Sequence, residues 1–187
     1  MTRIIAGRAG SITLEVPDAG TRPTSDRVRE SLFGALESAD ALQGAAVLDL
    51  YAGSGALGLE AVSRGAASAD LVEKSPRAAA VVERNAAKVA KSVGRDAAIR
   101  VHRCAVSAFL GGPRGPYDVV FLDPPYDLGE DELTDALALL VPSLAPGAFV
   151  IVERAAKSPM PAVPAGLTHA RDKRYGDTVL WWVRGAV

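Results

Sequence analysis

The sequence predicts an α/β fold built on a mostly parallel, seven-stranded sheet with helices on both faces. Aliphatic runs of strand length alternate along the chain with longer stretches of helical periodicity, which is typical of strand–helix–strand units. Three of these runs are followed directly by glycine, acidic or proline residues. These residues would stand at the carboxyl ends of strands, where open parallel sheets bind their ligands. The 187 residues are 49% hydrophobic, which is enough for one buried core.

The N-terminal segment is predicted to form a small β-hairpin followed by a helix. Strands over Ile4–Gly7 and Ser11–Val16 would be joined by a turn in the glycine-rich stretch Gly7–Gly10. The helix begins near Ser25, because Thr24 or Ser25 can cap it and apolar residues then recur at helical spacing. The apolar face of that helix comprises Val28, Leu32 and Leu36.

The rest of the chain supplies the strands of the sheet. Intervening helices are clearest over Pro76–Val93 and Glu130–Leu140. The last two strands are joined through Tyr175–Asp177, which suits a hairpin, so the final strand is expected to be antiparallel. The predicted sheet strands are Val47–Tyr51, Ala69–Glu73, Ile99–Cys104, Tyr117–Leu122, Ala148–Glu153, Leu167–Arg174 and Thr178–Val183.

A glycine-rich turn follows the first sheet strand. Gly53, Gly55 and Gly58 have G-x-G-x-x-G spacing, and glycines allow the backbone to approach a ligand closely. Twenty residues after Gly53 the next strand ends in Glu73, where a carboxylate can accept hydrogen bonds from both ribose hydroxyls. The pattern therefore favours a nucleoside-containing ligand, although such glycines can also serve only close helix–strand packing.

Asp49, just ahead of this turn, argues against a dinucleotide. Its carboxylate would repel a pyrophosphate, but it suits a ligand with an ammonium group and a sulfonium charge, such as S-adenosylmethionine. The sequence also has no G-x-x-x-x-G-K-[ST] string, which excludes a P-loop.

A second motif, Asp123-Pro124-Pro125-Tyr126, follows the strand Tyr117–Leu122. The two prolines stiffen the turn, so the Asp123 carboxylate and the Pro124 carbonyl can be aimed at one point. An exocyclic amine offers two N–H donors to meet them, which orients its nitrogen lone pair for attack on a methyl carbon. Tyr126 supplies a ring for base stacking. A plain proline-rich turn is the alternative interpretation.

The chain resembles the class I S-adenosylmethionine-dependent methyltransferases that act on amino groups, which have a Rossmann-like fold. More narrowly, it resembles the bacterial 16S ribosomal RNA guanine-N2 methyltransferase family. The specific string is RPTSDRVRESLF, whereas the glycine and DPPY strings are shared with many amino methyltransferases. The matching segments are Arg3–Gly10, Arg22–Phe33, Asp49–Ala66, Val72–Ala78, Asp123–Tyr126 and Lys173–Thr178.

This resemblance implies three groups of site residues. The catalytic residues are Asp123, Pro124, Pro125 and Tyr126. The residues expected to bind S-adenosylmethionine are Thr24, Arg27, Asp49, Tyr51, Ala52, Gly53, Ser54, Gly55, Glu73, Lys74, Ala105, Val106 and Asp123. Those expected to contact substrate RNA are Arg3, Arg8, Arg22, Tyr126, Lys173 and Tyr175.

The resemblance also implies the partner and the domain organisation. The expected partner is 16S ribosomal RNA, within the small ribosomal subunit or an assembly intermediate of it. We expect one methyltransferase domain over residues 1–187, with an RNA-contacting extension at 1–40 and a catalytic core at 41–187, acting as a monomer. The reaction needs no metal, and the sequence has no close Cys/His cluster. Neither an export leader nor a membrane segment is recognisable, so a cytoplasmic location is expected.

Charge is distributed unevenly, although the formal net charge is only −1. Residues 74–103 carry eight basic and two acidic side chains, whereas residues 123–135 carry six acidic side chains and no basic one. The N-terminal segment carries Arg3, Arg8, Arg22, Arg27 and Arg29, which can grip phosphates, and RNA contact is favoured for the first three. The side chains of Arg84, Lys88 and Lys91 are expected mainly to solvate an outer helix face. Arg27 can also pair with Glu30.

The main departure from the wider class lies after the third strand. Many class I methyltransferases have a carboxylate there that binds the adenine amine, whereas this chain has Cys104-Ala105-Val106-Ser107. Backbone groups around Ala105 and Val106 are then expected to recognise the adenine, with the Val106 side chain against the ring. Two alternatives stay open: an adenine-N6 methyltransferase of DNA or RNA, and a noncatalytic RNA-binding or ribosome assembly factor.

Overall fold

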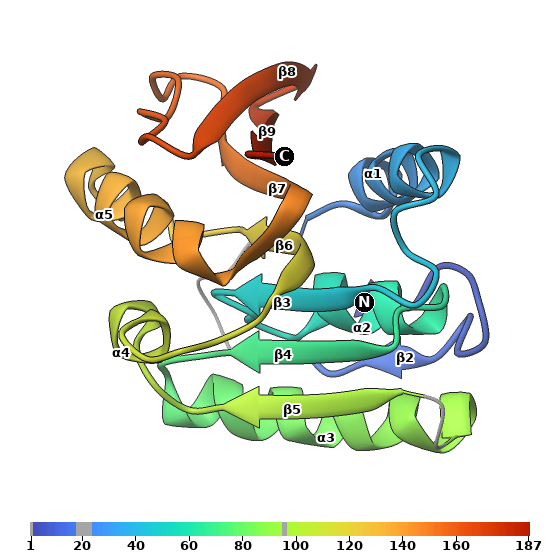
Figure 1. Ribbon diagram of the computed structural model, residues 1–187. Helices are drawn as coiled ribbons and strands as arrows, with labels where there is room; N and C mark the ends of the chain where they lie inside the picture. Colours follow the sequence, from blue (N-terminus) through green and yellow to red (C-terminus); the bar gives the residue numbers. More distant parts are fainter. Residues whose placement is uncertain (1, 18–23, 95–96) are drawn as a thin grey trace.

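The structure is a computed structural model that describes residues 2–17, 24–94 and 97–187. Within that part of the chain, seven strands form one sheet in the order β5-β4-β3-β6-β7-β9-β8 (Figure 1). The first five strands in this order, from β5 through β4, β3 and β6 to β7, run parallel to one another. Strand β9 is antiparallel to both of its neighbours, β7 and β8. The strands are β3 (Ala46–Leu50), β4 (Ser68–Val72), β5 (Ala98–His102), β6 (Tyr117–Leu122), β7 (Leu144–Ala155), β8 (Leu167–Tyr175) and β9 (Thr178–Gly185).

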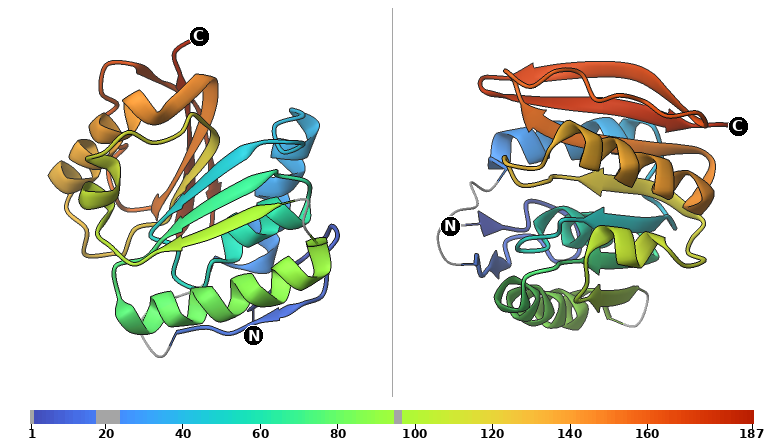
Figure 2. Two further views of the ribbon diagram at one scale, coloured as in Figure 1. Left: turned by 60° about the horizontal axis from the view of Figure 1, so that its bottom comes forward. Right: turned by 90° about the vertical axis from the view of Figure 1, so that its left-hand side faces the viewer.

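Helices cover both faces of the sheet (Figure 2). One apolar cluster joins α1, α2, α3 and the N-terminal segment to one face, and a second joins α4 and α5 to the other. Neighbouring strand residues alternate between the clusters, as Val47 and Leu48 do on β3. The helices are α1 (Asp26–Ser38), α2 (Ala56–Ser63), α3 (Pro76–Val93), α4 (Val106–Leu110), α5 (Glu130–Leu140) and the 3₁₀ turn η2 (Val141–Ser143).

The predicted sheet and its hairpin ending are therefore confirmed, and two helices have the predicted bounds. Strand β7 begins at Leu144, four residues earlier than predicted, because Leu144 pairs with Tyr117 across a register shift in β6. Ser25 caps α1, since its side chain accepts a hydrogen bond from Val28 N–H. Among the described residues, no helix is long and apolar enough to cross a membrane.

The N-terminal hairpin is shorter than predicted. Its strands are only β1 (Thr2–Arg3) and β2 (Thr13–Leu14), so strand assignment over Ile4–Gly7 was wrong. The amides of Ile5 and Ala6 donate hydrogen bonds to the Glu60 carboxylate instead of to a neighbouring strand. The segment is thus fastened to α2 by a side chain, which sequence periodicity does not reveal.

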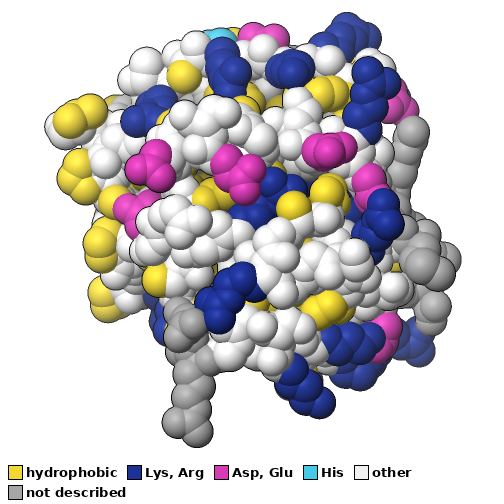
Figure 3. Space-filling model, turned by 90° about the vertical axis from the view of Figure 1, so that its right-hand side faces the viewer, with side chains coloured by type: hydrophobic (Ala, Val, Ile, Leu, Met, Phe, Trp, Pro, Cys, Tyr) yellow, Lys and Arg dark blue, Asp and Glu magenta, His cyan; other side chains and the backbone are white. Residues whose placement is uncertain are grey.

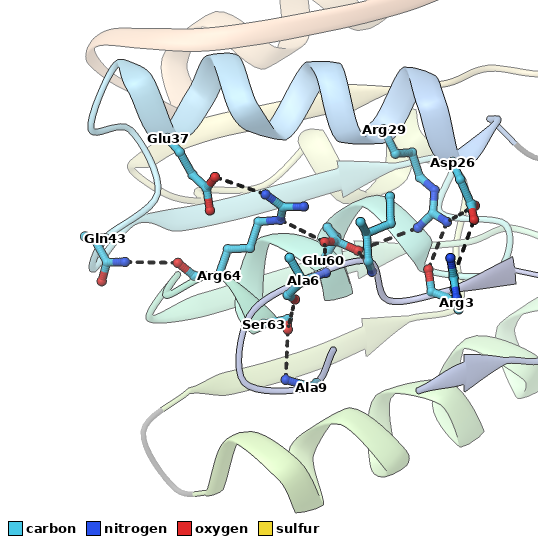
Figure 4. A network of polar contacts seen from close by, with 11 residues as sticks. Arg3, Ala6, Ala9, Asp26, Arg29, Glu37, Gln43, Glu60, Ser63 and Arg64 are labelled. Atoms are coloured by element: carbon cyan, nitrogen blue, oxygen red, sulfur yellow. Dashed lines mark hydrogen bonds and ion pairs between the residues drawn. The ribbon is translucent and has the colours of Figure 1, made fainter. Parts of the chain in front are cut away.

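Glu60 is the centre of a buried polar network that docks α1 and the N-terminal segment on α2 (Figure 4). Its carboxylate accepts a 2.8 Å hydrogen bond from Arg64 Nε and lies 3.7 Å from Arg29 Nη1. Arg29 also donates to the Arg3 carbonyl and to Asp26. Because both arginines neutralise the buried acid, this network holds the N-terminal extension against the core.

Candidate active site at the carboxyl ends of the sheet

A cavity of about 1410 Å³ lies at the carboxyl ends of β3, β4 and β6. Both sequence motifs reach it, although about seventy positions separate them in the chain, because parallel strands end at the same edge of the sheet. Leu50 on β3 pairs with Leu122 on β6, so the glycine turn and the DPPY turn start side by side. The cavity lining includes these predicted site residues: Tyr51, Gly53, Glu73, Lys74, Ala105, Val106, Asp123, Pro124, Pro125 and Tyr126.

The glycine turn is held in an unusual backbone conformation. Gly53 and Gly55 have φ of 61° and 80°, and Tyr51, a non-glycine residue, has φ of 64°. Left-handed backbone at a non-glycine residue is uncommon and often marks a functional site. Gly53 N–H donates to Glu73 Oε2 at 3.0 Å, while Ser75 N–H donates to Glu73 Oε1 at 2.8 Å. Glu73 therefore lines the cavity and also ties the turn to the start of α3.

Asp49 lies behind this turn and does not line the cavity. Its Oδ2 accepts a 2.9 Å hydrogen bond from Gly58 N–H, and its Oδ1 is buried with no partner among the described residues. Burial raises the pKa of Asp49 to about 7. A side chain at Gly58 would lie 2.2 Å from Leu71 and 3.1 Å from Asp49, so the third glycine of the motif serves close packing.

Three further predicted residues, Ala52, Ser54 and Gly55, also stand in the turn but not in the cavity lining. Ala52 N–H bonds the Val72 carbonyl, and the Ser54 carbonyl accepts from Asn85. Gly55 begins α2. These contacts fix the shape of the turn.

At the other side of the cavity, two carboxylates share one hydroxyl. Thr24 Oγ1 lies 3.2 Å from Asp123 Oδ2 and 2.8 Å from Glu153 Oε2. Burial and the neighbouring Glu153 raise the pKa of Asp123 well above its usual range, and burial raises the pKa of Glu153. No arginine or lysine is paired with either acid among the described residues. The site thus places two acids with raised pKa values close together beside the DPPY turn.

Glu153 is the functional candidate that the sequence analysis missed. It was assigned only as the last residue of a strand. Leu122 and Val152 pair across β6 and β7, which makes Asp123 and Glu153 neighbours at the strand ends. The sequence does show an acidic residue at the end of the predicted strand Ala148–Glu153. Its proximity to Asp123 could be predicted only once it was known that this strand lies next to the strand that precedes the DPPY motif.

A smaller polar cavity of about 380 Å³ lies on the other side of Glu153. Thr24 and Arg27, predicted to bind the cofactor, line this cavity and not the larger one. Tyr126, Glu153 and Thr178 line both cavities, so the two meet there. Tyr126 is 64% exposed at this junction, where a flat ligand can stack on its ring.

The basic side chains predicted to contact RNA lie in different settings. Lys173 and Tyr175 both contact the Ser31 hydroxyl, and Tyr175 lines the smaller cavity. Arg3 is exposed and pairs with Asp26 at 3.6 Å. Arg8 is exposed, and its backbone N–H bonds Ser63. Arg22 lies outside the described residues.

Two groups of basic residues serve the structure. Arg29, counted among the N-terminal arginines but not among the predicted RNA contacts, is fully buried against Glu60. Arg84 and Lys88 each pair with Glu15 at 2.8 Å and so attach α3 to the N-terminal segment. On the face at the amino ends of β3 to β5, basic and acidic side chains are interspersed (Figure 3).

Comparisons with known proteins find matches that extend over nearly the whole chain. A model of the family described as conserved hypothetical protein 95 matches residues 2–184. The chain is 39% identical to ribosomal RNA small subunit methyltransferase D of Escherichia coli strain K12, over 93% of this chain and 85% of that protein. It is 34% identical to the protein of the same name from Haemophilus influenzae, over 93% of this chain and 89% of that protein.

Solved structures show the same fold. An Escherichia coli protein described as a candidate methyltransferase, yhhF, has a TM-score of 0.85 and 35% identity, with 98% of this chain and 97% of that chain covered. An RNA methyltransferase from Salinibacter ruber, solved with S-adenosyl-L-homocysteine, has a TM-score of 0.64 and 18% identity. The match covers 88% of this chain and 94% of that chain. These likenesses confirm the predicted Rossmann-like fold class.

Proposed function

This chain belongs to the family described as conserved hypothetical protein 95, and from that premise we propose that it methylates the exocyclic N2 amine of a guanine in 16S ribosomal RNA. It is an S-adenosylmethionine-dependent methyltransferase of ribosomal RNA, as the resemblance predicted. The observation that carries the proposal is the meeting of the glycine turn and Asp123 in one cavity at adjacent strand ends.

The residues around the larger cavity fit S-adenosylmethionine. Gly53 leaves room for close approach, and Glu73 retains lone pairs for ribose hydroxyls beside its two amide contacts. Ala105 and Val106 lie where an adenine would be recognised. Asp49 lies behind the turn and outside the cavity lining, so its predicted contact with the ammonium group stays a prediction. When bound, S-adenosylmethionine would supply an electrophilic methyl group on a sulfonium, a leaving group that keeps the electrons of the methyl–sulfur bond.

Asp123 acts on the amine that attacks. Its carboxylate accepts one N–H of the guanine amine, and the Pro124 carbonyl accepts the other, which directs the nitrogen lone pair toward the cavity. The proton released from N2 after transfer goes to the Asp123 carboxylate. Burial and the adjacent Glu153 raise the pKa of Asp123, so this carboxylate accepts a proton readily. Tyr126 stacks on the base, which must leave its own stack to reach the site.

The finer parts of the proposal concern the partner. We expect the substrate to be the small ribosomal subunit or an assembly intermediate, and the enzyme to act as a monomer in the cytoplasm. Residues 1–40 are expected to form the RNA-contacting extension, with Arg3 and Arg8 on its exposed surface. Lys173 and Tyr175 would contact RNA from β8, next to the smaller cavity.

The experiment is to incubate the protein with radiolabelled S-adenosylmethionine and unmethylated small ribosomal subunits, digest the RNA and identify the labelled nucleoside. Label in N2-methylguanosine supports the proposal. Label in N6-methyladenosine would keep the fold and the chemistry of the amine site but overturn the choice of base. If small subunits, free ribosomal RNA and DNA all stay unlabelled while the cofactor binds, the protein is a binding factor and the proposal fails.

A further inference from the structure

Glu153 occupies a position that the proposed transfer reaction does not by itself require. It lies on β7 next to Asp123 on β6, and the Thr24 hydroxyl contacts both carboxylates. The two contacted oxygens therefore lie within about 6 Å of each other. Glu153 also lines both cavities, so it stands between the methyl-donor side and the smaller polar cavity.

The Watson–Crick edges of purines differ at the point where a second carboxylate would reach them. In guanine, the N2 amine is adjacent to N1–H, so that two neighbouring groups both donate hydrogen bonds. In adenine, the N6 amine is adjacent to an unprotonated N1, which only accepts. A carboxylate beside the one that holds the amine can therefore accept a hydrogen bond from guanine, while it repels the N1 lone pair of adenine.

We propose that Glu153 is the residue that selects guanine, by accepting the N1–H of the base while Asp123 accepts an N–H of the N2 amine. The inference rests on the proposed function and deepens it. The target base enters through the smaller cavity, and its reactive edge faces the pair of acids. Tyr126, at the junction of the cavities, stacks on the base in this arrangement.

Thr24 positions the pair from outside the sheet. It precedes the capping residue Ser25 of α1, and α1 is docked on the core by the Arg29–Glu60 contact. Because one hydroxyl approaches an oxygen of each acid, it restrains Asp123 in the larger cavity and Glu153 where the two cavities meet. A carboxylate held there and not paired with a cation among the described residues has to meet donors from a ligand or remain poorly compensated.

The test replaces the guanine that is labelled in the first experiment by 2-aminopurine, in a ligated 16S RNA assembled into small subunits. This base keeps the 2-amino group but has an unprotonated N1. The wild-type enzyme should methylate guanine at least ~10-fold to 100-fold faster than 2-aminopurine, because the Glu153 carboxylate would be left without its donor. Glu153→Gln presents an amide N–H to N1, so the preference should collapse or invert.

Two controls separate selection from a structural role. Glu153→Ala removes both the acceptor for N1–H and the repulsion of an unprotonated N1, so it should slow guanine methylation and shrink the preference, whereas Glu83→Gln, exposed on α3, should keep the wild-type preference. Cofactor affinity, measured by calorimetry, and the unfolding midpoint report whether each variant is folded. If folded Glu153→Gln keeps the wild-type ratio between the two bases, the inference is overturned. Because the wild-type labelling comes first, a failure of the proposed function is seen before this ratio is measured.

Discussion

Two clusters of acidic side chains in this molecule differ in the cations and hydrogen-bond donors that surround their carboxylates. Glu60 is fully buried, and two arginines and two backbone amides surround its carboxylate. Asp123 and Glu153, in contrast, are neighbours that share only the Thr24 hydroxyl, with no cation paired to either among the described residues. The first cluster lies under the N-terminal segment, and the second opens into two cavities.

The difference separates charge that serves the fold from charge that serves a ligand. A buried acid with its hydrogen bonds filled by the protein fastens one element to another. An acid whose pKa is raised by burial and by a like charge awaits donors from outside, which is the usual situation at a catalytic site. Substitutions in the two clusters should therefore affect different measurements.

The largest expected effect on activity is that of Asp123→Ala. The variant loses the acceptor that orients the amine, so turnover on small subunits should fall by about 10²-fold to 10³-fold or more. Cofactor affinity should stay largely intact, because the glycine turn and Glu73 are untouched. Single-turnover methyl transfer and calorimetric titration of the cofactor measure the two effects. Asp131→Ala, exposed on α5, is the matched control. Turnover at the wild-type rate would remove Asp123 from the reaction.

Glu73→Ala should affect binding more than chemistry. The substitution removes the carboxylate expected to bind the ribose and also frees the amides of Gly53 and Ser75. The cofactor dissociation constant should rise by about 10-fold to 100-fold. Calorimetry gives this value, with the exposed Glu83→Ala as control. An unaltered dissociation constant would contradict the role of Glu73, and would place it with Glu60 among the structural acids.

Asp49 is a third poorly compensated acid, and its effect should appear in the pH dependence of stability. In the folded state its pKa is about 7, above the ordinary value of 3.8. Between these values the folded chain holds a proton that the unfolded chain has lost, so the free energy of unfolding should fall as pH rises from about 4 to about 7.

The slope from this single group approaches about 1.4 kcal/mol per pH unit at most. Asp49→Asn should lack that contribution, whereas Asp131→Asn should retain it. Denaturant unfolding at pH 4, 5.5 and 7 measures the difference. Parallel curves for Asp49→Asn and the wild type would show that Asp49 is not a buried, protonated acid in the folded state.

The sheet, and the proximity of the glycine turn to the DPPY turn, could be predicted because the sequence patterns behind them are local. Each strand shows its own aliphatic run, and parallel strands necessarily bring Gly53 and Asp123 to one edge. The bounds of α3 and α5 followed from periodicity.

The residues that were missed depend on contacts between distant parts of the chain. Glu153 meets Thr24 across 129 positions, and Glu60 binds Ile5 across 55. Neither contact leaves a periodic pattern. Arg29 looks like any surface arginine until α1 is placed over Glu60, and only then is its burial understood. The shortened hairpin has the same cause, since its amides bond Glu60 and not a strand.

The most direct test compares the free energy of unfolding of Glu60→Ala and Asp123→Ala with that of the wild type, by chemical denaturation at pH 7. Glu60→Ala strands Arg29 and Arg64 without their counter-charge, so it should lose about 3–5 kcal/mol. Asp123→Ala relieves the repulsion between two adjacent acids, so its stability should stay within about 1 kcal/mol of the wild type or rise. A loss from Asp123→Ala as large as that from Glu60→Ala would show that both acids hold the fold, and would contradict the distinction between the two clusters.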